Sequence, residues 1–218
     1  AGTRLWPLTT QKQPKHLLKL FGRKCLIELT VEKLRGHIPD DRIIILTNVH
    51  YRELTRQTLS YIPPENFICE PCVCDTASAI GLAATVVKQR CEAATMIMLT
   101  ADQIIEPADR FNVAIGHATR FLESHPDKLI AFGVEAAFAN TQVGWQKLGK
   151  VLGFSGCEVR KIDTFMEKPD LALAQRFMDE GGYCWNSGQF AWKTDAILKE
   201  IGTHLPEATP LLEEIGAA

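Results

Sequence analysis

The sequence predicts an α/β fold with a doubly wound, mainly parallel sheet and helices on both of its faces. Short apolar, β-branched runs alternate with longer helical patterns as far as about residue 135. Several of these runs are apolar throughout, which is typical of strands that are buried on both faces. Beyond residue 135 strand-like runs follow one another without a helix between them, which predicts a β-rich extension.

The elements of the first part follow in strict alternation. Strands are predicted at 42–47, 66–69, 95–99 and 128–133, and helices at 49–61, from 75 or 76 to 87, and at 107–122. Pro63 and Pro64 end the first helix, because proline has no amide hydrogen for the helix ladder. Asp75 or Thr76 can cap the second helix. Pro107 begins the third, at a position where the missing amide hydrogen has no cost.

The second part carries a different pattern. Strand-like runs are predicted at 148–154 and 157–167, a helix at 169–180, a strand or loop at 183–192, and a further helix from Thr194. Gly181 and Gly182 follow the helix at 169–180 and can supply its left-handed C-terminal cap.

Composition excludes several functional classes. The chain has 218 residues and a net charge of −2, so it carries no basic field of the kind that nucleic acids require. It has no apolar run near the ~20 residues that span a bilayer, and its first residues lack a signal-peptide pattern. We therefore expect a cytoplasmic protein without nucleic-acid or membrane partners.

The seven cysteines do not indicate a disulfide framework, because their number is odd and the chain is not small. Cys69, Cys72 and Cys74 form a C-x-x-C-x-C cluster that invites a zinc interpretation. A zinc site needs a fourth ligand, and no second pair of cysteines or histidines stands at metal-site spacing. Half-buried thiols in a loop between a strand and a helix are the favoured interpretation.

In a parallel sheet, ligands bind beyond the carboxyl ends of the strands, and polar residues follow the predicted strands at these ends. Glu70 follows the second strand and Asp102 follows the third. Each could instead be a plain loop carboxylate or a helix cap. Arg4 and Lys15 could likewise be solvated charges. The alternative is that the loop around them binds a phosphate, and such a loop must leave a strand. Under this alternative we expect a strand ahead of Ala1.

Five stretches occur in the order found in one enzyme family. They are Gly2-Thr3-Arg4-Leu5-Trp6-Pro7-Leu8 with Pro14-Lys15, Glu70-Pro71 with Asp75-Thr76-Ala77, Thr100-Ala101-Asp102, Phe165-Met166-Glu167-Lys168-Pro169, and Trp185-Asn186-Ser187-Gly188-Gln189-Phe190. Together they resemble the sugar-phosphate nucleotidyltransferases, in the form typical of mannose-1-phosphate guanylyltransferases. The last three resemble the family motifs P-A-D-H, F-x-E-K-P and W-N-S-G-M-F. The resemblance extends from residue 1 to about residue 200.

The resemblance implies a Rossmann-like nucleotidyltransferase fold and transfer of a guanylyl group from GTP to mannose 1-phosphate, with Mg²⁺. It implies that Arg4, Lys15 and Asp102 are catalytic and that Asp102 holds the metal. For the nucleotide it implies Gly2, Thr3, Arg4, Glu70, Thr76 and Ala101. For the sugar phosphate it implies Gly144, Glu167, Lys168, Asn186 and Gly188.

The resemblance also implies one domain over residues 1–218, with a nucleotide-binding part at 1–135 and a sugar-phosphate-binding part at 136–218. It implies that this domain is cut at both ends, so that a second metal-binding aspartate lies beyond Ala218. A homo-oligomer is possible.

The chain departs from the family patterns at several positions. P-A-D-H reads Thr100-Ala101-Asp102-Gln103, T-G-Y-G-Y reads Thr141-Gln142-Val143-Gly144-Trp145, and Cys74 stands where related sequences usually carry arginine. Two alternatives therefore stay open. One is a hexose-1-phosphate nucleotidyltransferase that uses UTP, dTTP or CTP, and the other is a non-catalytic module that binds a nucleotide sugar.

Overall fold

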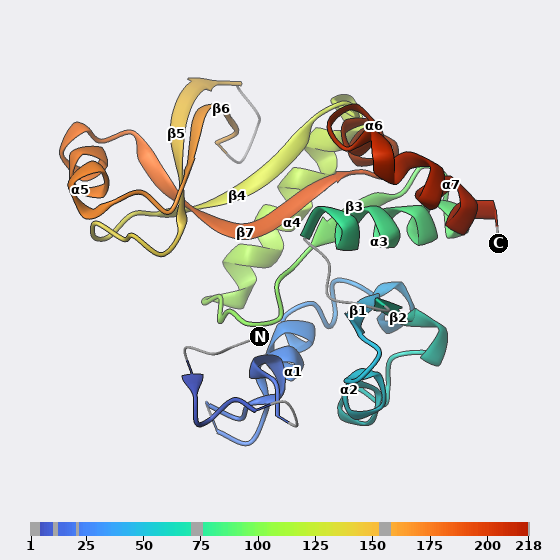
Figure 1. The fold of residues 1–218 in the computed structure, drawn as a ribbon. Coiled ribbons are helices and arrows are strands. Elements are labelled where there is room, and N and C mark those ends of the chain that lie inside the picture. The colour runs from blue at the N-terminus through green and yellow to red at the C-terminus, as the bar shows by residue number, and fades with distance from the viewer. Residues whose placement is uncertain (1–4, 11–12, 21, 71–75, 153–157, 218) are drawn as a thin grey trace.

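The computed structural model describes residues 5–10, 13–20, 22–70, 76–152 and 158–217. Its strands are β1 (Ile45–Asn48), β2 (Phe67–Glu70), β3 (Thr95–Met98), β4 (Leu129–Glu135), β5 (Gly144–Val151), β6 (Arg160–Glu167) and β7 (Tyr183–Lys193). Its helices are α1 (Leu26–Glu32), α2 (Arg52–Thr58), α3 (Thr76–Arg90), α4 (Ala108–Ser124), α5 (Leu171–Glu180), α6 (Thr194–His204) and α7 (Thr209–Ala217). The predicted α/β class is confirmed, and each predicted strand and helix of the described residues is present with shifted ends (Figure 1).

The strands form two sheets. β1 and β2 pair in parallel, whereas the larger sheet has the order β3-β7-β5-β6 with β4 also on β7, and all of its pairings are antiparallel. Ala191 of β7 lies opposite both Ile97 of β3 and Ile130 of β4. β3 and β4 therefore run in the same direction on either side of β7, and α4 connects them. The predicted strand–helix–strand unit exists, but β7 returns from the extension and lies between its two strands. The predicted parallel pairing is therefore present only at β1–β2 among the described residues, and the larger sheet is antiparallel rather than mainly parallel.

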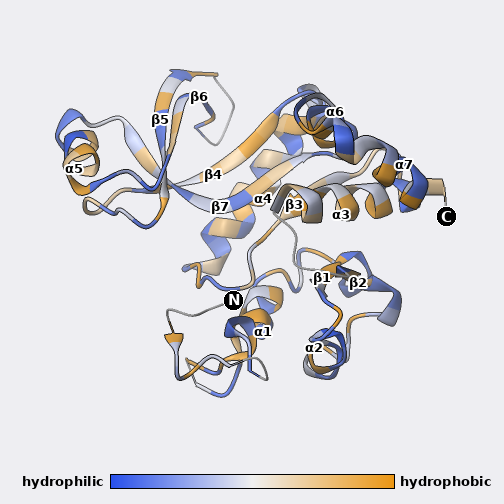
Figure 2. Ribbon diagram, in the orientation of Figure 1, coloured by the Kyte–Doolittle hydropathy of each residue, from blue (hydrophilic) through white to orange (hydrophobic). Residues whose placement is uncertain are grey.

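Helices cover both faces of the larger sheet around β7. Ala118 and Leu122 of α4 pack on one face, against Ala191 and its neighbours Ile97 and Ile130. The alternate residues of the same strands face the other way, and they pack with α3, α6 and α7 in a cluster formed by Ala84, Met96, Met98, Phe190, Trp192, Ile197, Ile201 and Leu212. This alternation is the period of two that a strand imposes. Figure 2 shows hydrophilic and hydrophobic residues alternating around α4.

The predicted β-rich extension consists of β5, β6 and α5. It has a core of its own, in which Trp145, Ala174 and Phe177 are buried. Gly181 and Gly182, which follow α5, have φ angles of +68° and +72°, so both glycines adopt the positive φ expected at the end of a helix. The predicted left-handed helical cap is not formed at Gly181, because its ψ angle is 179°. The extension remains part of the larger sheet, because β7 pairs with β5 at one end and with β3 at the other.

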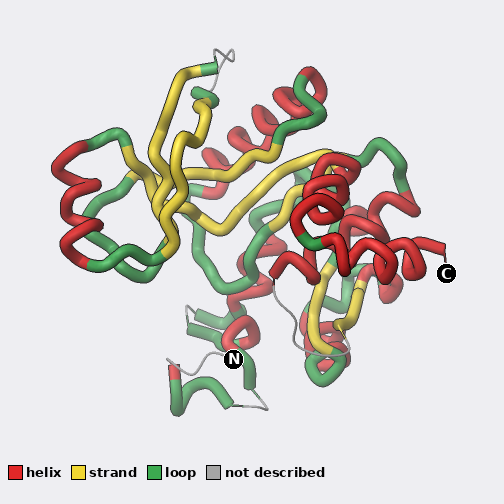
Figure 3. The backbone as a smooth tube through the Cα atoms, turned by 45° about the horizontal axis from the view of Figure 1, so that its top comes forward, coloured by secondary structure: helices red, strands yellow, loops and turns green. Residues whose placement is uncertain are grey.

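The β1–β2 pair forms a separate small sheet beside α1 and α2 (Figure 1, Figure 3). Its core reaches α4 through Phe111 and Ile115. Neither α1 nor α7 is predicted from the sequence. At α1 the N-terminal capping box is built by Cys25 and Glu28, and cysteine is not among the residues that signal a helix start.

Candidate active site

Lys15 and Asp102 meet in the structure although 87 residues separate them in the sequence. Lys15 begins a short 3₁₀ turn after Pro14, and Asp102 lies in the loop that leaves β3. The Lys15 ammonium donates a hydrogen bond of 2.8 Å to the Asp102 carboxylate, and the two side chains are 37% and 43% exposed. A pair this exposed contributes at most about 1 kcal/mol to stability. Because both charged groups are accessible from solvent, both can contact a ligand.

Two further basic side chains lie near this pair. Lys33, at the end of α1, donates from its ammonium to the carbonyl oxygen of Gln103 at 3.3 Å. Burial lowers the pKa of Lys33, and the charge of Glu106 opposes that shift. Burial also lowers the pKa of His16, which the neighbouring Asp102 carboxylate opposes. Sequence reasoning missed both residues, because neither stands in a motif and Lys33 is 70 residues from its partner.

Three predicted sugar-phosphate residues converge where β5, β6 and β7 meet. Gly144 of β5 is the register partner of Glu167 on β6. A methyl group added at Gly144 would lie 2.8 Å from Glu167 Oε2 and 3.3 Å from Asn186 Cβ. The Lys168 ammonium contacts the Glu167 carboxylate at 2.6 Å, and Lys168 has a φ of +47° in the left-handed region. Gly144 therefore makes room for the side chains of Glu167 and Asn186.

Gly188 lies between this group and the loop of Asp102. Its amide donates to Asn186 Oδ1 at 3.2 Å, and its φ of +72° suits glycine. A methyl group at Gly188 would lie 3.6 Å from Gln103 Nε2. Asn186 Oδ1 also accepts from the buried amide of Gln146 at 3.1 Å, a residue that the sequence did not single out. The direct contact between β7 and the Asp102 loop is made by the next residue, Gln189, whose side-chain nitrogen donates to Gln103 Oε1 at 3.4 Å.

Glu70 and Ala101 line a cavity of about 810 Å³ between the β1–β2 pair and β3. The other lining residues are mainly aliphatic side chains of β1, β3, α1, α3 and α4. Burial raises the pKa of the Glu70 carboxyl. Thr76 is the exposed first residue of α3. Gly2, Thr3 and Arg4 lie outside the described residues, as do Asp75, Cys72 and Cys74.

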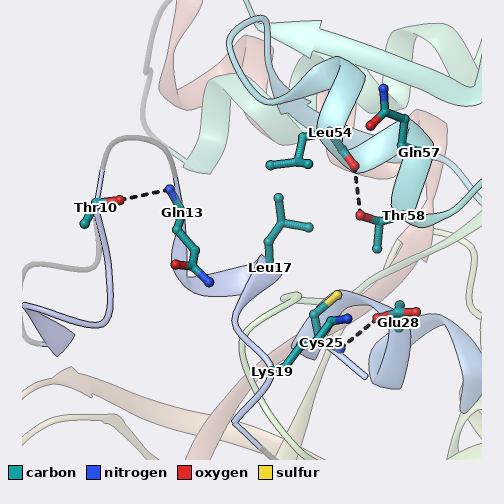
Figure 4. A pocket seen from close by; sticks show the side chains of 9 residues that line it. All are labelled: Thr10, Gln13, Leu17, Lys19, Cys25, Glu28, Leu54, Gln57 and Thr58. Atoms are coloured by element: carbon teal, nitrogen blue, oxygen red, sulfur yellow. Dashed lines mark hydrogen bonds between the residues drawn. The ribbon is translucent and has the colours of Figure 1, made fainter. Parts of the chain in front are cut away.

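A second cavity, of about 640 Å³, lies between the segment at 10–19, α1 and α2 (Figure 4). It is lined by Thr10, Gln13, Leu17, Lys19, Cys25, Glu28, Leu54, Gln57 and Thr58. None of these residues belongs to the predicted site. The buried Cys25 is part of the α1 capping box, where its amide donates to Glu28 Oε2 at 2.7 Å. Cys25 and Glu28 therefore have a structural role in α1.

The described residues contain no group of three or more histidine, cysteine, aspartate or glutamate side chains that could hold a metal by themselves. Asp102 offers one half-exposed carboxylate. Mg²⁺ in phosphate-transferring proteins is bound by one or two carboxylates together with substrate oxygens and water. The chemistry of Asp102 therefore fits Mg²⁺ that arrives with a nucleotide. Within the described residues, no helix is both apolar and long enough to span a bilayer.

The chain is similar to several known proteins. The chain is 31% identical over 218 residues to a mannose-1-phosphate guanylyltransferase of Escherichia coli, covering 98% of this chain and 46% of that protein. It is 32% identical over 223 residues to the Klebsiella pneumoniae protein of the same name, covering 100% of this chain and 45% of the other. The chain thus spans about half the length of these curated relatives.

Two solved structures share the fold. One, described as a mannose-1-phosphate geranyltransferase from Thermus thermophilus, has a TM-score of 0.83 at 26% identity, over 99% of this chain and 61% of that one. The other, described as a mannose-6-phosphate isomerase from Helicobacter pylori, has a TM-score of 0.77 at 26% identity, over 92% and 75%. The family model for nucleotidyl transferases matches residues 1–218, and this chain therefore belongs to the nucleotidyl transferase family.

Proposed function

We propose that this chain transfers the guanylyl group of GTP to mannose 1-phosphate, which gives GDP-mannose and pyrophosphate. The observation that carries the proposal is the 2.8 Å contact between Lys15 and Asp102. It joins a cation suited to phosphate with a carboxylate suited to Mg²⁺, and β7, which carries Asn186, contacts the Asp102 loop through Gln189 and Gln103. The names of the relatives support the choice of substrates.

The reaction asks little covalent chemistry of the protein. An oxygen of the sugar phosphate attacks the α-phosphorus of GTP, the bond between the α-phosphorus and its bridging oxygen breaks, and pyrophosphate leaves with the electron pair. Catalysis of such a step consists mainly of positioning two polyanions and neutralising their charge. Mg²⁺, when bound, supplies further neutralisation of phosphate charge.

The residues of the first part would serve the nucleotide. Lys15 binds phosphate oxygens near the reacting centre, which frees Asp102 for the metal. Arg4 binds the outer phosphates, while Gly2 and Thr3 allow the backbone to approach them. Glu70 accepts hydrogen bonds from N1–H and the 2-amino group of guanine, a pair of donors that other bases do not present together. Thr76 and Ala101 complete the nucleotide site at this end.

The residues of the second part would serve the sugar phosphate. Glu167 and Asn186 accept and donate hydrogen bonds to sugar hydroxyls, and Lys168 binds the phosphate. Gly144 and Gly188 let the substrate approach the backbone. We therefore infer a nucleotide-binding part at 1–135 and a sugar-phosphate-binding part at 136–218, and we place the reaction in the cytoplasm.

The test is pyrophosphate release by the 218-residue chain with GTP, UTP, dTTP or CTP, each against mannose 1-phosphate and glucose 1-phosphate. The proposal expects the highest kcat/KM with GTP and mannose 1-phosphate. A higher value with another pair would assign the chain to the alternative substrate class. Titration calorimetry with Mg-GTP separates the remaining cases, because binding without turnover indicates a non-catalytic module and absence of binding contradicts the assignment.

A further inference from the structure

A buried glutamine of β7 holds the loop that carries Asp102. Gln189 is 1% exposed, and its side-chain oxygen accepts a hydrogen bond from the amide of Thr100 at 3.2 Å. Its side-chain nitrogen donates to Thr100 Oγ1 at 3.1 Å and to Gln103 Oε1 at 3.4 Å. The oxygen and the nitrogen of this amide are thus both engaged, as a buried polar group requires. Thr100 and Gln103 lie on either side of Asp102.

The backbone of Gln189 is also held in place, by a bulge in β7. β7 carries a bulge at Ser187–Gln189, where three residues face the single residue Phe132 of β4. Ser187 Oγ donates to the carbonyl oxygen of Phe132 at 2.7 Å and accepts from the amide of Gln189 at 3.1 Å. The bulge therefore fixes the backbone of Gln189, and Gln189 in turn fixes both flanks of Asp102.

The sequence gives a second, independent observation. Thr100, Gln103 and Gln189 are three positions where this chain departs from P-A-D-H and W-N-S-G-M-F. Proline at position 100 would have no amide hydrogen to donate, and methionine at position 189 would have no side-chain amide oxygen to accept it. The three departures are thus the three members of one hydrogen-bonded cluster.

We propose that Gln189 is a positioning residue that fixes Asp102 relative to Lys15 and to the sugar-phosphate residues, and that Thr100, Gln103 and Gln189 act as one unit. The inference rests on the proposed function, because it concerns the carboxylate that would hold the metal. Gln189 acts through the loop, and Asp102 itself meets the ligand.

The first experiment measures whether the three residues depend on one another. Gln189→Met leaves the amide and hydroxyl of Thr100 and the Gln103 side chain without their partner, and we expect the Tm to fall by roughly 2–10 °C. The triple variant Thr100→Pro/Gln103→His/Gln189→Met restores the family pattern and is expected to regain more than half of that loss. A triple variant with a Tm as low as that of Gln189→Met, or lower, would overturn the claim of one unit.

The second experiment measures positioning with MnCl₂ and GTP as the probe, by titration calorimetry on the full chain. Loss of a residue that orients a metal ligand typically weakens metal affinity roughly 10- to 100-fold, and we expect this for Gln189→Met. The matched control is Gln146→Met, which removes an equally buried amide from the same sheet that contacts Asn186 rather than the Asp102 loop. It is expected to lower the Tm without weakening Mn-GTP binding.

The outcomes separate the two proposals. If the unmodified chain does not bind Mn-GTP, the proposed function fails and the positioning role falls with it, while the Tm series still decides whether the cluster is one unit. If the chain binds Mn-GTP and Gln189→Met binds it equally well despite a lower Tm, the function stands and the positioning role is overturned. Weakening in Gln189→Met alone supports both.

Discussion

At the scale of the residue, a substitution in the Lys15–Asp102 pair is expected to change activity much more than stability. Because both side chains are more than a third exposed, Asp102→Asn is expected to change the free energy of unfolding by less than about 1 kcal/mol. The same change is expected to lower Mg²⁺-dependent pyrophosphate release roughly 100-fold or more, because charge neutralisation by a metal is worth several kcal/mol. Urea unfolding and steady-state kinetics measure the two effects.

The chain offers a matched control for this substitution. Asp195 of α6 forms an ion pair of 2.6 Å with Lys88 of α3, and these side chains are 62% and 44% exposed. Asp195→Asn removes the same charge from a comparable pair outside the predicted site. It is expected to retain full turnover. Equal turnover in the two variants would count against a metal role for Asp102.

Glu70 gives a prediction that depends on pH. Burial raises its pKa above the usual 4.5, so the folded chain binds this proton more strongly than the unfolded chain. The free energy of unfolding therefore carries a contribution from Glu70 that falls as the pH rises above about 4.5. Glu70→Gln removes that contribution, so the variant should gain stability relative to the parent as the pH rises from 4.5 to about 7.

Urea unfolding of the variant and the parent at both pH values measures the difference between their free energies of unfolding. If that difference does not change with pH, the prediction is contradicted. The proposed role in base recognition predicts a second effect for the same variant. GTP affinity should fall by about tenfold, because a charged acceptor is worth roughly 1.5–3 kcal/mol in a hydrogen bond. Affinity for UTP should change little.

At the scale of the element, the close approach of β5 to β6 and β7 depends on Gly144. Gly144→Ala would place a methyl group 2.7 Å from the Phe165 ring and 2.8 Å from Glu167 Oε2, so these side chains must move. Displacement of positioned groups by about 1 Å costs up to about 100-fold. We expect KM for mannose 1-phosphate to rise about tenfold or more while Mg-GTP affinity stays the same.

Gly116 of α4 is the control for this variant, because a methyl group there meets no atom within 4 Å apart from the backbone of its own helix. Gly116→Ala should raise the free energy of unfolding by about 0.5–1 kcal/mol, as in other helix interiors, and leave KM unchanged. A KM for Gly144→Ala equal to that of the parent would contradict a sugar-phosphate site at the junction of β5, β6 and β7.

At the scale of the whole molecule, the cavity of about 810 Å³ lies between two strands that pair on one side only among the described residues. β1 pairs with β2, and β3 pairs with β7. Asn112 also lines this cavity, and its buried Oδ1 has no hydrogen-bond partner in the described part of the chain. Folded interiors rarely contain voids larger than a water molecule.

An added apolar strand would suit this space. A fused apolar segment of about six residues is expected to insert between β1 and β3 and raise the Tm by roughly 5 °C or more, because each buried aliphatic side chain contributes about 1.5–3 kcal/mol before the entropic cost of ordering it. A glycine–serine extension of equal length is the control. Equal Tm values for the two fusions, with no added amide protection in β1 and β3, would refute the prediction.

Much of the candidate site follows from motifs, because a motif fixes residue types at short spacing. Asp102, Glu167 and Asn186 are predicted in this way, and the structure connects their loops. Lys33 and Gln189 are not predicted as site residues, because their contacts span 70 and 86 or more residues of sequence. The one signal for Gln189 is its place in a motif that carries methionine elsewhere. The predicted roles of Gly2, Thr3 and Arg4 concern residues outside those described.

The sequence by itself determined the alternation of strands and helices, the glycines at positive φ after α5 and the residue types of the site. These features depend on windows of a few residues, where periodicity and turn chemistry act directly. Only the tertiary structure decided that β7 lies between β3 and β4, and that Lys15 reaches Asp102. Pairing between distant segments depends on the burial that the whole chain achieves against the entropy of closing long loops, and no local pattern records that balance.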